Sequence, residues 1–278
     1  MSAPETGNKP LHITFIGAGN MATAMIRGLL AGGCEPATIR AADPLNAALS
    51  TIASHGIVTT TDNNAAIANA DVVVLAVKPQ VAQQVVKGLH TLTPKTLLIS
   101  IAAGINLSSL QSWTSNEQPI VRCMPNTPAL MGAGIAGLFA NNACVAEHQV
   151  SAAQVLSAAG EIVWVDAETQ LDAVTAVSGS GPAYFFLLME AMIDAGQQRG
   201  LSRETATQLT LQTAFGAALM ARDSDTTPAQ LRQNVTSPGG TTAAALEVML
   251  QRQLPDIVAE SISAADRRAA ELAEEFGR

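Results

Sequence analysis

The chain has 278 residues, of which 48% are hydrophobic and 14% are charged, and its formal net charge is −8. This length allows two domains with buried cores, and a negative charge without any lysine or arginine run disfavours nucleic acid as a partner. Cys34, Cys123 and Cys144 show no C-x-x-C spacing, so neither a metal site nor a disulfide framework is predicted, and we expect a cytoplasmic protein. The most apolar stretch, 183–193, is interrupted by Glu190 and is too short to cross a bilayer, so no membrane contact is expected.

The first half of the chain alternates strand-like and helix-like segments. Its apolar runs are continuous rather than alternating, which is typical of parallel strands that are covered on both faces. The order of segments predicts an α/β fold, with a Rossmann-type doubly wound parallel sheet over residues 1–166. The expected strands are 13–16, 39–42, 72–77, 97–102 and 120–123, and segments 134–139 and 161–165 could extend the sheet. The expected helices are 20–31, 45–54, 79–89 and 107–113.

The second half, residues 167–278, has a different pattern, because strand signals stop after about Asp166 and apolar residues recur at helical spacing. An all-helical domain is therefore predicted. Ser202 and Thr205 suit a helix start, and Gly200 suits the end of the preceding helix. The expected helices are 170–200, 203–222, 228–234, 242–251 and 256–276.

A glycine-rich turn between the first expected strand and helix has the form G-x-G-x-x-A. Gly17 allows a tight turn, Gly19 lets a pyrophosphate approach the backbone, and the small Ala22 allows close packing of the helix on the sheet. The acid Asp43 ends the next apolar segment, which is where such folds bind a ribose. The pattern predicts a nicotinamide or flavin dinucleotide at this turn.

The helical half lacks the usual bases for alcohol oxidation. Every lysine lies at or before Lys95 and every histidine at or before His148, and Tyr184 is the only tyrosine in the chain. Oxidation of an alcohol commonly needs such a base, whereas an iminium carbon is already electrophilic and needs a hydride donor, a positioned substrate and a polar group near the nitrogen. The absence favours reduction of a C=N bond, although carboxylates remain available as bases.

Two loops rich in glycine and hydroxyl groups, 176–182 and 234–242, lie next to expected helices. Each could be an ordinary interhelical loop with caps. The second combines a Pro-Gly-Gly turn with the N-terminus of a helix, which suits the binding of a small carboxylate.

The chain resembles the pyrroline-5-carboxylate reductase family over nearly its whole length. The similarity rests on five stretches: 15–22, 75–79, 122–128, 172–184 and 237–242. The resemblance implies reduction of 1-pyrroline-5-carboxylate to L-proline, the last step of proline biosynthesis, by hydride transfer from NADPH or NADH to the C=N bond.

The resemblance also implies roles for particular residues. The hydroxyl of Thr242 would hydrogen-bond the ring nitrogen as the catalytic group. Thr175 would line the same pocket, and Asp225 would help to order it. Alternatively, Asp225 is only an acidic residue in a surface turn. The substrate carboxylate would be held by the loop from Ser237 to Thr241, through Ser237, Gly239, Gly240 and Thr241.

On the cofactor side, Lys78 and Pro79 would border the dinucleotide, Asn63 would contact the adenosine half, and Ala102, Ala103 and Asn126 would approach the nicotinamide half. Asp43 by itself favours NADH, whereas the family widely uses NADPH, so NADPH or NADH both remain open. The full expected set is Gly17, Ala18, Gly19, Asn20, Met21, Asp43, Asn63, Ala76, Val77, Lys78, Pro79, Ala102, Ala103 and Asn126.

The helical domain of this family interlocks with that of a second subunit, so a homodimer is the minimum assembly expected. Two other interpretations stay open. A β-hydroxyacid dehydrogenase-like enzyme would carry a lysine on the first long helix, but no lysine follows Lys95. A dinucleotide-sensing protein without enzymatic activity would bind the cofactor and would not need the loop at 237–242.

Overall fold

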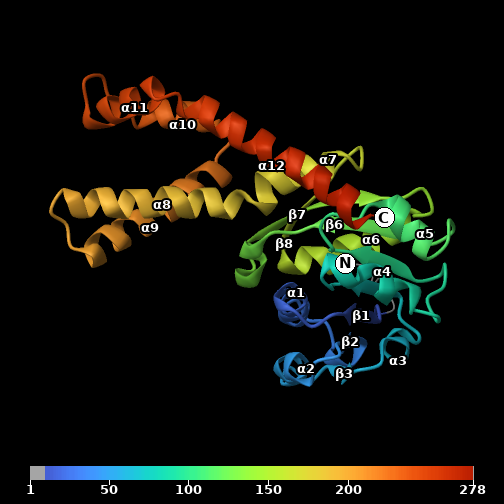
Figure 1. Ribbon diagram of the computed structural model, residues 1–278. Coiled ribbons are helices and arrows are strands. Elements are labelled where there is room, and N and C mark those ends of the chain that lie inside the picture. Colours follow the sequence, from blue (N-terminus) through green and yellow to red (C-terminus); the bar gives the residue numbers. More distant parts are fainter. Residues whose placement is uncertain (1–9, 278) are drawn as a thin grey trace, which may run out of the picture. The chain divides into compact units, whose positions relative to one another are not determined.

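The computed structural model describes residues 10–277, and within them eight strands form one sheet (Figure 1). Their order is β3-β2-β1-β4-β5-β6-β7-β8, and all neighbours are parallel except β6 and β7. The strand order reverses beside β1, which confirms the doubly wound sheet. The bounds are β1 (Ile13–Ile16), β2 (Ile39–Ala42), β3 (Val58–Thr60), β4 (Val72–Leu75), β5 (Leu97–Ser100), β6 (Ile120–Met124), β7 (Gly134–Ala140) and β8 (Gly160–Trp164).

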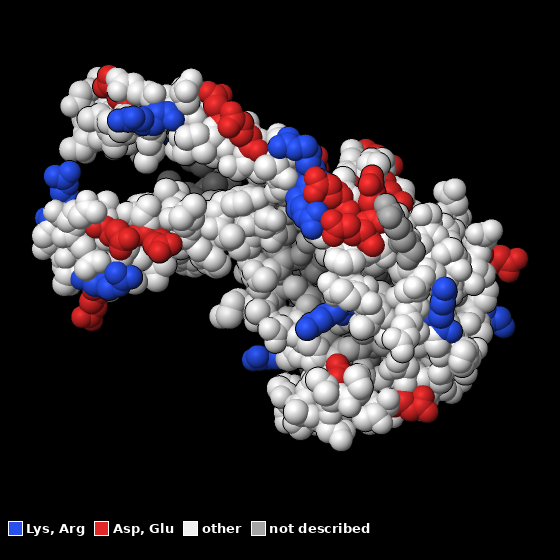
Figure 2. All heavy atoms as spheres, viewed as in Figure 1, with Lys and Arg blue, Asp and Glu red and all other residues white. Residues whose placement is uncertain are grey.

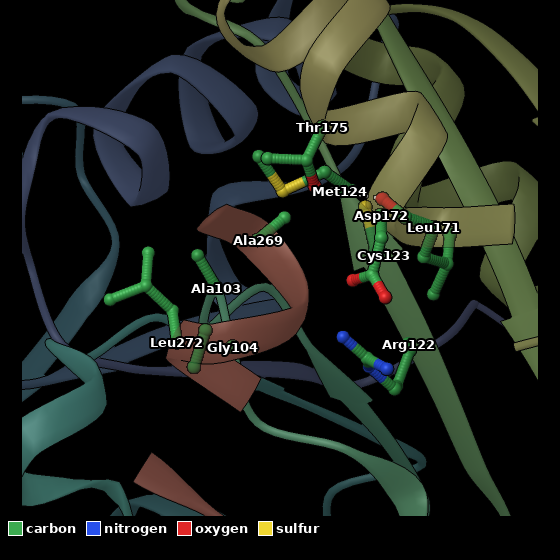
Figure 3. A pocket seen from close by; sticks show the side chains of 11 residues that line it. Ala103, Gly104, Arg122, Cys123, Met124, Leu171, Asp172, Thr175, Ala269 and Leu272 are labelled. Atoms are coloured by element: carbon green, nitrogen blue, oxygen red, sulfur yellow. Dashed lines mark hydrogen bonds between the residues drawn. The ribbon is translucent and has the colours of Figure 1, made fainter. Parts of the chain in front are cut away.

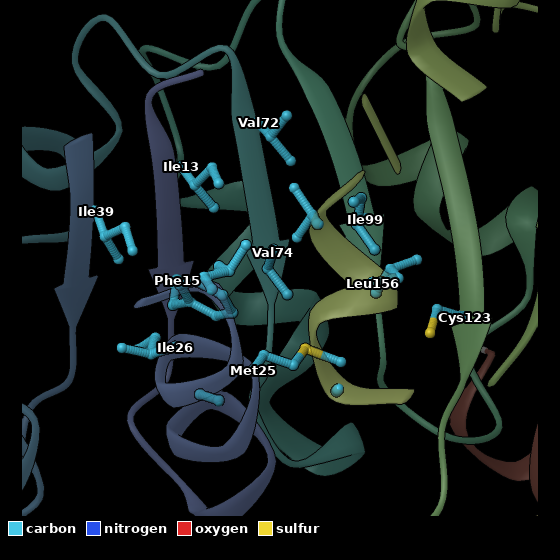
Figure 4. Packing of buried hydrophobic residues seen from close by; sticks show 14 of the residues in the cluster. Ile13, Phe15, Met25, Ile26, Ile39, Val72, Val74, Ile99, Cys123 and Leu156 are labelled. Atoms are coloured by element: carbon cyan, nitrogen blue, oxygen red, sulfur yellow. The ribbon is translucent and has the colours of Figure 1, made fainter. Parts of the chain in front are cut away.

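Helices cover both faces of this sheet, which explains why its central strands are continuously apolar. Ile13 and Phe15 of β1 belong to a core with α1 (Asn20–Ala31), α2 (Asn46–Ala53) and α6 (Ala146–Leu156) (Figure 4). Ile16 faces a second core with α3 (Asn63–Ile67), α4 (Pro79–Lys87) and α5 (Leu107–Trp113). Since successive side chains of a strand point to opposite faces, a strand between two helical layers buries both of its faces and is mostly apolar.

The structure corrects several expected segments. Strands β4 and β5 end at Leu75 and Ser100, two residues before the ends predicted for them. The expected ranges omitted β3, α3 and α6, while 134–139 and 161–165 do extend the sheet as β7 and β8. The lengths of the apolar runs therefore overestimated the lengths of these two strands. The residues after Leu75 and Ser100 leave the sheet and contribute to the site described below.

The remaining helices form the second half of the chain as predicted, apart from a break near the start. The bounds are α7 (Gln170–Val174), a π-helix (Thr175–Gly179), α8 (Gly181–Gln198), α9 (Arg203–Arg222), α10 (Pro228–Asn234), α11 (Thr241–Gln251) and α12 (Leu254–Phe276). The Ser202 hydroxyl accepts the Thr205 N–H at 3.1 Å, and Gly200 has a φ of +94°, so both predicted helix ends are confirmed.

The chain divides into two compact units. The sheet unit comprises residues up to Gly179 together with the segment from Ala265 onward, and the helical unit is Ser180–Ala264. The end of α12 therefore belongs with the sheet: Phe276 packs against its second core, and the Ser109 hydroxyl donates to the Gly277 carbonyl at 2.7 Å. The domain boundary expected between residues 166 and 167 stays a prediction.

The helical unit buries very little of itself. Of its residues, which are all described, only Gly181, Ala206 and Thr210 are buried. Phe185 and Phe215 are 63% and 59% exposed. In Figure 2 the charged side chains over α8 and α9 gather toward the end of α8 and the start of α9, and the rest of the visible surface of these helices is uncharged. A unit with so small a core cannot offset the entropy of folding alone, so its apolar surface requires another partner surface.

We predict that Gly28→Ala destabilises the protein by about 1–3 kcal/mol, although alanine has the higher helix propensity. A Cβ at Gly28 of α1 would lie 1.8 Å from the carbonyl oxygen of Ala158, which is backbone and cannot rotate away. Thermal and denaturant unfolding of both proteins would measure the change. An unchanged or raised stability would contradict this account of how α1 packs.

Candidate functional site

The turn between β1 and α1 requires glycine at position 17. Gly17 has a φ of +101°, and a Cβ there would lie 2.4 Å from the Ala76 carbonyl oxygen. The Gly17 N–H donates to the Ala42 carbonyl at 2.7 Å, and the Ala76 N–H donates to the Ile16 carbonyl at 2.8 Å. These bonds hold the turn between the carboxyl ends of β2 and β4, at the reversal point of the sheet where such folds bind ligands.

The N-terminus of α1 has the features that a pyrophosphate needs. Gly19 is the N-cap residue, no side chain caps the helix, and nothing lies within 4 Å of the position a Cβ would take. The first N–H groups of α1, from Asn20 and Met21 onward, therefore remain available to an anion. Ala22 is buried, as its packing role predicts. The residues present fit the phosphates of a dinucleotide.

The acid predicted to contact the ribose lies directly beside this turn. Asp43 follows β2, and its Oδ2 accepts the Ala18 N–H at 2.9 Å while its Oδ1 accepts the Leu45 N–H at 2.9 Å. Asp43 is therefore fixed between the glycine-rich turn and the start of α2. Sequence reasoning predicted its place at the strand end, but not that it also fastens the turn.

The other predicted cofactor residues gather at the same edge of the sheet, because the strands they follow are parallel. Ala76, Val77, Lys78 and Pro79 follow β4 and lead into α4, with Lys78 exposed at the N-cap.

Asn63 begins α3 after β3, and Ala102 and Ala103 follow β5, where Ala102 is buried and Ala103 exposed. Asn126 follows β6 and is 8% exposed. Its Oδ1 accepts the Ile135 N–H at 3.0 Å, so that oxygen already has a structural partner.

Thr175 lines a small cavity of about 30 Å³ within the sheet unit (Figure 3). The cavity lies between the carboxyl ends of β5 and β6, the helix that begins with α7, and α12. Thr175 begins the π-helix, and its hydroxyl donates to the Leu171 carbonyl at 2.8 Å. The oxygen is therefore oriented as an acceptor toward any further partner. π-Helical turns are frequent at functional sites.

The sequence analysis did not predict the charged group beside this cavity. Arg122 of β6 pairs with Glu168 at 2.6 Å, and the same Glu168 oxygen accepts the Leu107 N–H at 2.6 Å. Figure 3 shows the Asp172 carboxylate pointing toward Arg122. Burial raises the pKa of Asp172. The positive charge of Arg122 lowers that pKa, whereas the negative charges of Asp266 and Glu168 raise it further. An arginine inside a buried strand was the available signal, because such a charge needs a partner.

The loop predicted to bind the substrate lies in the helical unit. The Gly240 N–H donates to the Ser237 carbonyl at 3.0 Å, and Gly239 has a φ of +70°, so the loop is a tight turn. Gly240 caps α11 without any side-chain hydrogen bond, which leaves the N–H groups of Thr241 and Thr242 available. Ser237, Gly239, Thr241 and Thr242 are exposed, and Asp225, in the loop before α10, is exposed too.

The reversed sheet and the uncapped glycine turn define an oxidoreductase of the dinucleotide-binding α/β class. A family model described as "NADP oxidoreductase coenzyme F420-dependent" matches residues 12–104, and one described as "Pyrroline-5-carboxylate reductase dimerisation" matches residues 168–272. The chain is 53% identical to the pyrroline-5-carboxylate reductase of Pseudomonas aeruginosa over 96% of its own length and 98% of that protein, and it belongs to the pyrroline-5-carboxylate reductase family.

Solved structures agree with this assignment. The chain is similar to a pyrroline-5-carboxylate reductase from Coxiella burnetii, with 42% identity, a TM-score of 0.90 and coverage of 95% of this chain and 99% of that one. It is also similar to the Plasmodium falciparum enzyme solved with NADP bound, with 30% identity, a TM-score of 0.84 and coverage of 96% and 100%. The expectation of a dinucleotide-binding sheet followed by an all-helical dimerisation domain is confirmed.

The dimerisation match also explains an apolar helix. Residues 170–198 are long and apolar enough to cross a membrane by length and composition, which corrects the expectation that this region is too short. Only 11% of the most apolar part of this segment is buried within the chain. Because the segment lies inside the matched dimerisation region, a second subunit accounts for its exposed apolar side chains.

We predict that Gly19→Val abolishes binding of NADH and NADPH while the protein stays folded. The added side chain meets no protein atom near its Cβ, but it fills the approach to the N–H groups of α1. Gly19→Ala should weaken binding less, because it adds a single methyl group. Fluorescence titration with each dinucleotide, alongside circular dichroism, tests this. Normal binding to the valine variant would refute the pyrophosphate position.

Proposed function

We propose that this chain reduces 1-pyrroline-5-carboxylate to L-proline with NADPH or NADH as the reductant. The observation that carries the proposal is 53% identity to a pyrroline-5-carboxylate reductase across 96% of the chain. The glycine-rich turn supports it, because its geometry fits a dinucleotide. The bound dinucleotide supplies the hydride, so the protein must bind and orient the imino acid and provide polar contacts as the C=N bond is reduced.

The loop at 237–242 is proposed to bind the substrate carboxylate. The N–H groups at the start of α11 lack a capping side chain, and the Ser237 hydroxyl is exposed beside them. A Cβ at Gly240 would lie 2.5 Å from the Ser237 Oγ and 3.1 Å from the Ser237 carbonyl oxygen, so a larger residue there would displace the Ser237 hydroxyl. A carboxylate at this position would accept hydrogen bonds from Ser237, Gly239, Gly240 and Thr241, and it would be favoured by the dipole of α11.

Thr242 is proposed to act on the ring nitrogen. As hydride adds to the carbon of the C=N bond, the electron pair of that bond moves to nitrogen, which must be protonated or keep its proton. A hydroxyl at Thr242 can hydrogen-bond that nitrogen without a charged side-chain base. This assignment suits a helical half that contains no lysine or histidine. Thr175 contributes an acceptor to the same pocket, and Asp225 helps to order it.

The active site is proposed to form between two subunits. The cofactor residues lie in the sheet unit, while the loop at 237–242 lies in the helical unit, which buries only three residues within the chain. Association through the dimerisation region would bury the apolar faces of α8 and α9 and would complete the pocket. A homodimer is the smallest assembly that satisfies both needs.

We place the enzyme in the cytoplasm. Its three cysteines are free thiols, and none is paired although Cys34 and Cys144 are partly exposed. Burial raises the pKa of Cys123, so that thiol is poorly reactive. Such thiols suit a reducing compartment.

The function is tested by mixing the protein with pyrroline-5-carboxylate and NADPH or NADH and following the nicotinamide absorbance. The proposal expects oxidation of the dinucleotide and formation of proline in equal amounts. A dinucleotide-sensing protein would bind without turnover, and a β-hydroxyacid dehydrogenase would oxidise hydroxy acids instead. Binding without any proline would overturn the proposal.

We predict that Thr242→Ala lowers kcat on the order of 100-fold, because the ring nitrogen loses its hydrogen-bonding partner. Thr242→Ser keeps the hydroxyl and should retain most of the activity. The dissociation constant for NADPH should stay nearly constant in both variants, since Thr242 is not assigned to the cofactor. A comparable loss of NADPH affinity in the alanine variant would count against this role.

A shared site also predicts complementation between two inactive variants. Gly19→Val damages the cofactor half and Thr242→Ala damages the loop, so a heterodimer has one intact site only if each site uses both subunits. After denaturation and joint refolding, random pairing should restore about a quarter of wild-type activity. Light scattering would confirm the dimer in each sample. No recovery in verified heterodimers, or an active monomer, would exclude the shared site.

A further inference from the structure

We propose that Arg122 and Glu168 are positioning residues for hydride transfer, because their ion pair fixes the segment after β5 against the helix that carries Thr175. This inference rests on the proposed function, since it takes the segment after β5 to border the nicotinamide and Thr175 to line the substrate pocket. It deepens that function by naming two side chains that hold the cofactor side and the substrate side of the site in register.

The ion pair joins three segments at a single carboxylate oxygen. Arg122 lies on β6, and its Nη1 donates to the Glu168 Oε1 at 2.6 Å. The same oxygen accepts the Leu107 N–H at 2.6 Å. The side chains of Arg122 and Glu168 are only 11% and 28% exposed, so both contacts are largely shielded from water. Hydrogen bonds that involve ionised groups are stronger than those between neutral groups, and shielding preserves that strength.

Each of the joined segments leads directly to a residue of the proposed site. Leu107 begins α5 and ends the short segment after β5 in which Ala103 is proposed to approach the nicotinamide. Glu168 precedes α7, which continues without a gap into the π-helix that Thr175 begins. Ala103, Arg122 and Thr175 line the same small cavity (Figure 3). Loss of the ion pair would therefore let the two sides of that cavity shift relative to each other.

The charges around Arg122 explain why an arginine is needed inside the sheet unit. Asp172 of α7 directs its carboxylate toward Arg122, and Asp266 of α12 adds a further negative charge (Figure 3). Arg268 of α12 pairs instead with two exposed glutamates of its own helix. Without Arg122, the carboxylates of Glu168 and Asp172 would repel each other, and the start of α7 would lose its attachment to β6.

Hydride transfer depends steeply on the separation of donor and acceptor, so a small displacement is sufficient. A misplacement of about 1 Å, caused by a change remote from the reacting atoms, can slow a reaction on the order of 100-fold. Affinity for the dinucleotide should respond much less, because its phosphates are proposed to bind at the start of α1. Strands β4 and β5 lie between β1 and β6, so about 14 Å across the sheet separates that turn from the strand of Arg122.

The competing role for this ion pair is support of the fold alone. In that case, loss of the pair lowers the melting temperature, but the folded protein still transfers hydride at the wild-type rate. A positioning role instead slows hydride transfer in fully folded protein. The two roles therefore differ in one quantity, the rate of hydride transfer per folded active site at saturating substrate and dinucleotide.

The experiment measures hydride transfer in a single turnover, from the loss of nicotinamide absorbance, for the wild type, Arg122→Met, Glu168→Ala and Glu168→Gln. The KM for pyrroline-5-carboxylate, kcat and the dissociation constant for NADPH are measured alongside. Glu168→Gln is the conservative variant, because its amide oxygen can still accept from Arg122 and from the Leu107 N–H.

The matched control is Arg268→Gln, which also removes an arginine and its carboxylate contacts, but at a side chain that is 52% exposed. Circular dichroism and the melting temperature report whether each variant is folded. The comparison of Glu168→Ala with Glu168→Gln decides the matter if Arg122→Met does not fold.

The proposal expects hydride transfer to slow by about 10- to 100-fold in Arg122→Met and Glu168→Ala, while NADPH affinity stays nearly constant. Glu168→Gln and Arg268→Gln should keep most of the wild-type rate. Because both residues act through one contact, a variant that combines Arg122→Met with Glu168→Ala should be no slower than the slower single variant.

A wild-type rate in folded Arg122→Met and Glu168→Ala would overturn the proposal and leave the ion pair with a structural role. An equal loss of rate in Glu168→Gln or in Arg268→Gln, or a parallel fall in NADPH affinity, would overturn it too. A wild-type protein that oxidised no dinucleotide in the presence of pyrroline-5-carboxylate would instead defeat the proposed function itself.

Discussion

The close approach of β1 and β4 at their carboxyl ends is the constraint on which the site depends. Only a residue without a Cβ fits at Gly17, where the Ala76 carbonyl lies across the turn. This approach lets α1 start immediately after β1 with its first N–H groups uncapped and accessible. The same turn is held from the other side by Ala42 and Asp43. Cofactor binding thus follows from backbone geometry more than from any single reactive side chain.

A second constraint acts on the helical unit, which exposes the apolar residues that a folded unit would normally bury. Its loop at 237–242 carries uncapped N–H groups and hydroxyls but no lysine, histidine or metal-binding cluster within the described residues. Such a loop suits a substrate that is already electrophilic and carries a carboxylate. In the proposed dimer, the contact that buries the helices would also complete the pocket, so dimerisation and catalysis would be linked.

The sequence predicted the features that depend on local chemistry and missed those that depend on distant contacts. The bounds of β1, α1 and α9 agree with prediction, since glycine turns and caps mark their ends. Strand β3 and helix α3 were missed because they are too short to show a clear periodicity of apolar residues. The pairing of Arg122 with Glu168 and the return of α12 to the sheet join segments far apart in the chain, and no local pattern encodes them. The candidate cofactor residues that follow parallel strands lie at one edge of the sheet, because the carboxyl ends of parallel strands share that edge.

The most direct measurement is a crystal structure of the dimer with proline and oxidised dinucleotide bound together. We expect proline to lie between the loop at 237–242 of one subunit and the nicotinamide held by the sheet unit of its partner. Its carboxylate should contact the N–H groups at the start of α11, and its ring nitrogen should lie within hydrogen-bonding distance of the Thr242 hydroxyl. Proline bound away from that loop, or a pocket completed within a single subunit, would contradict the account.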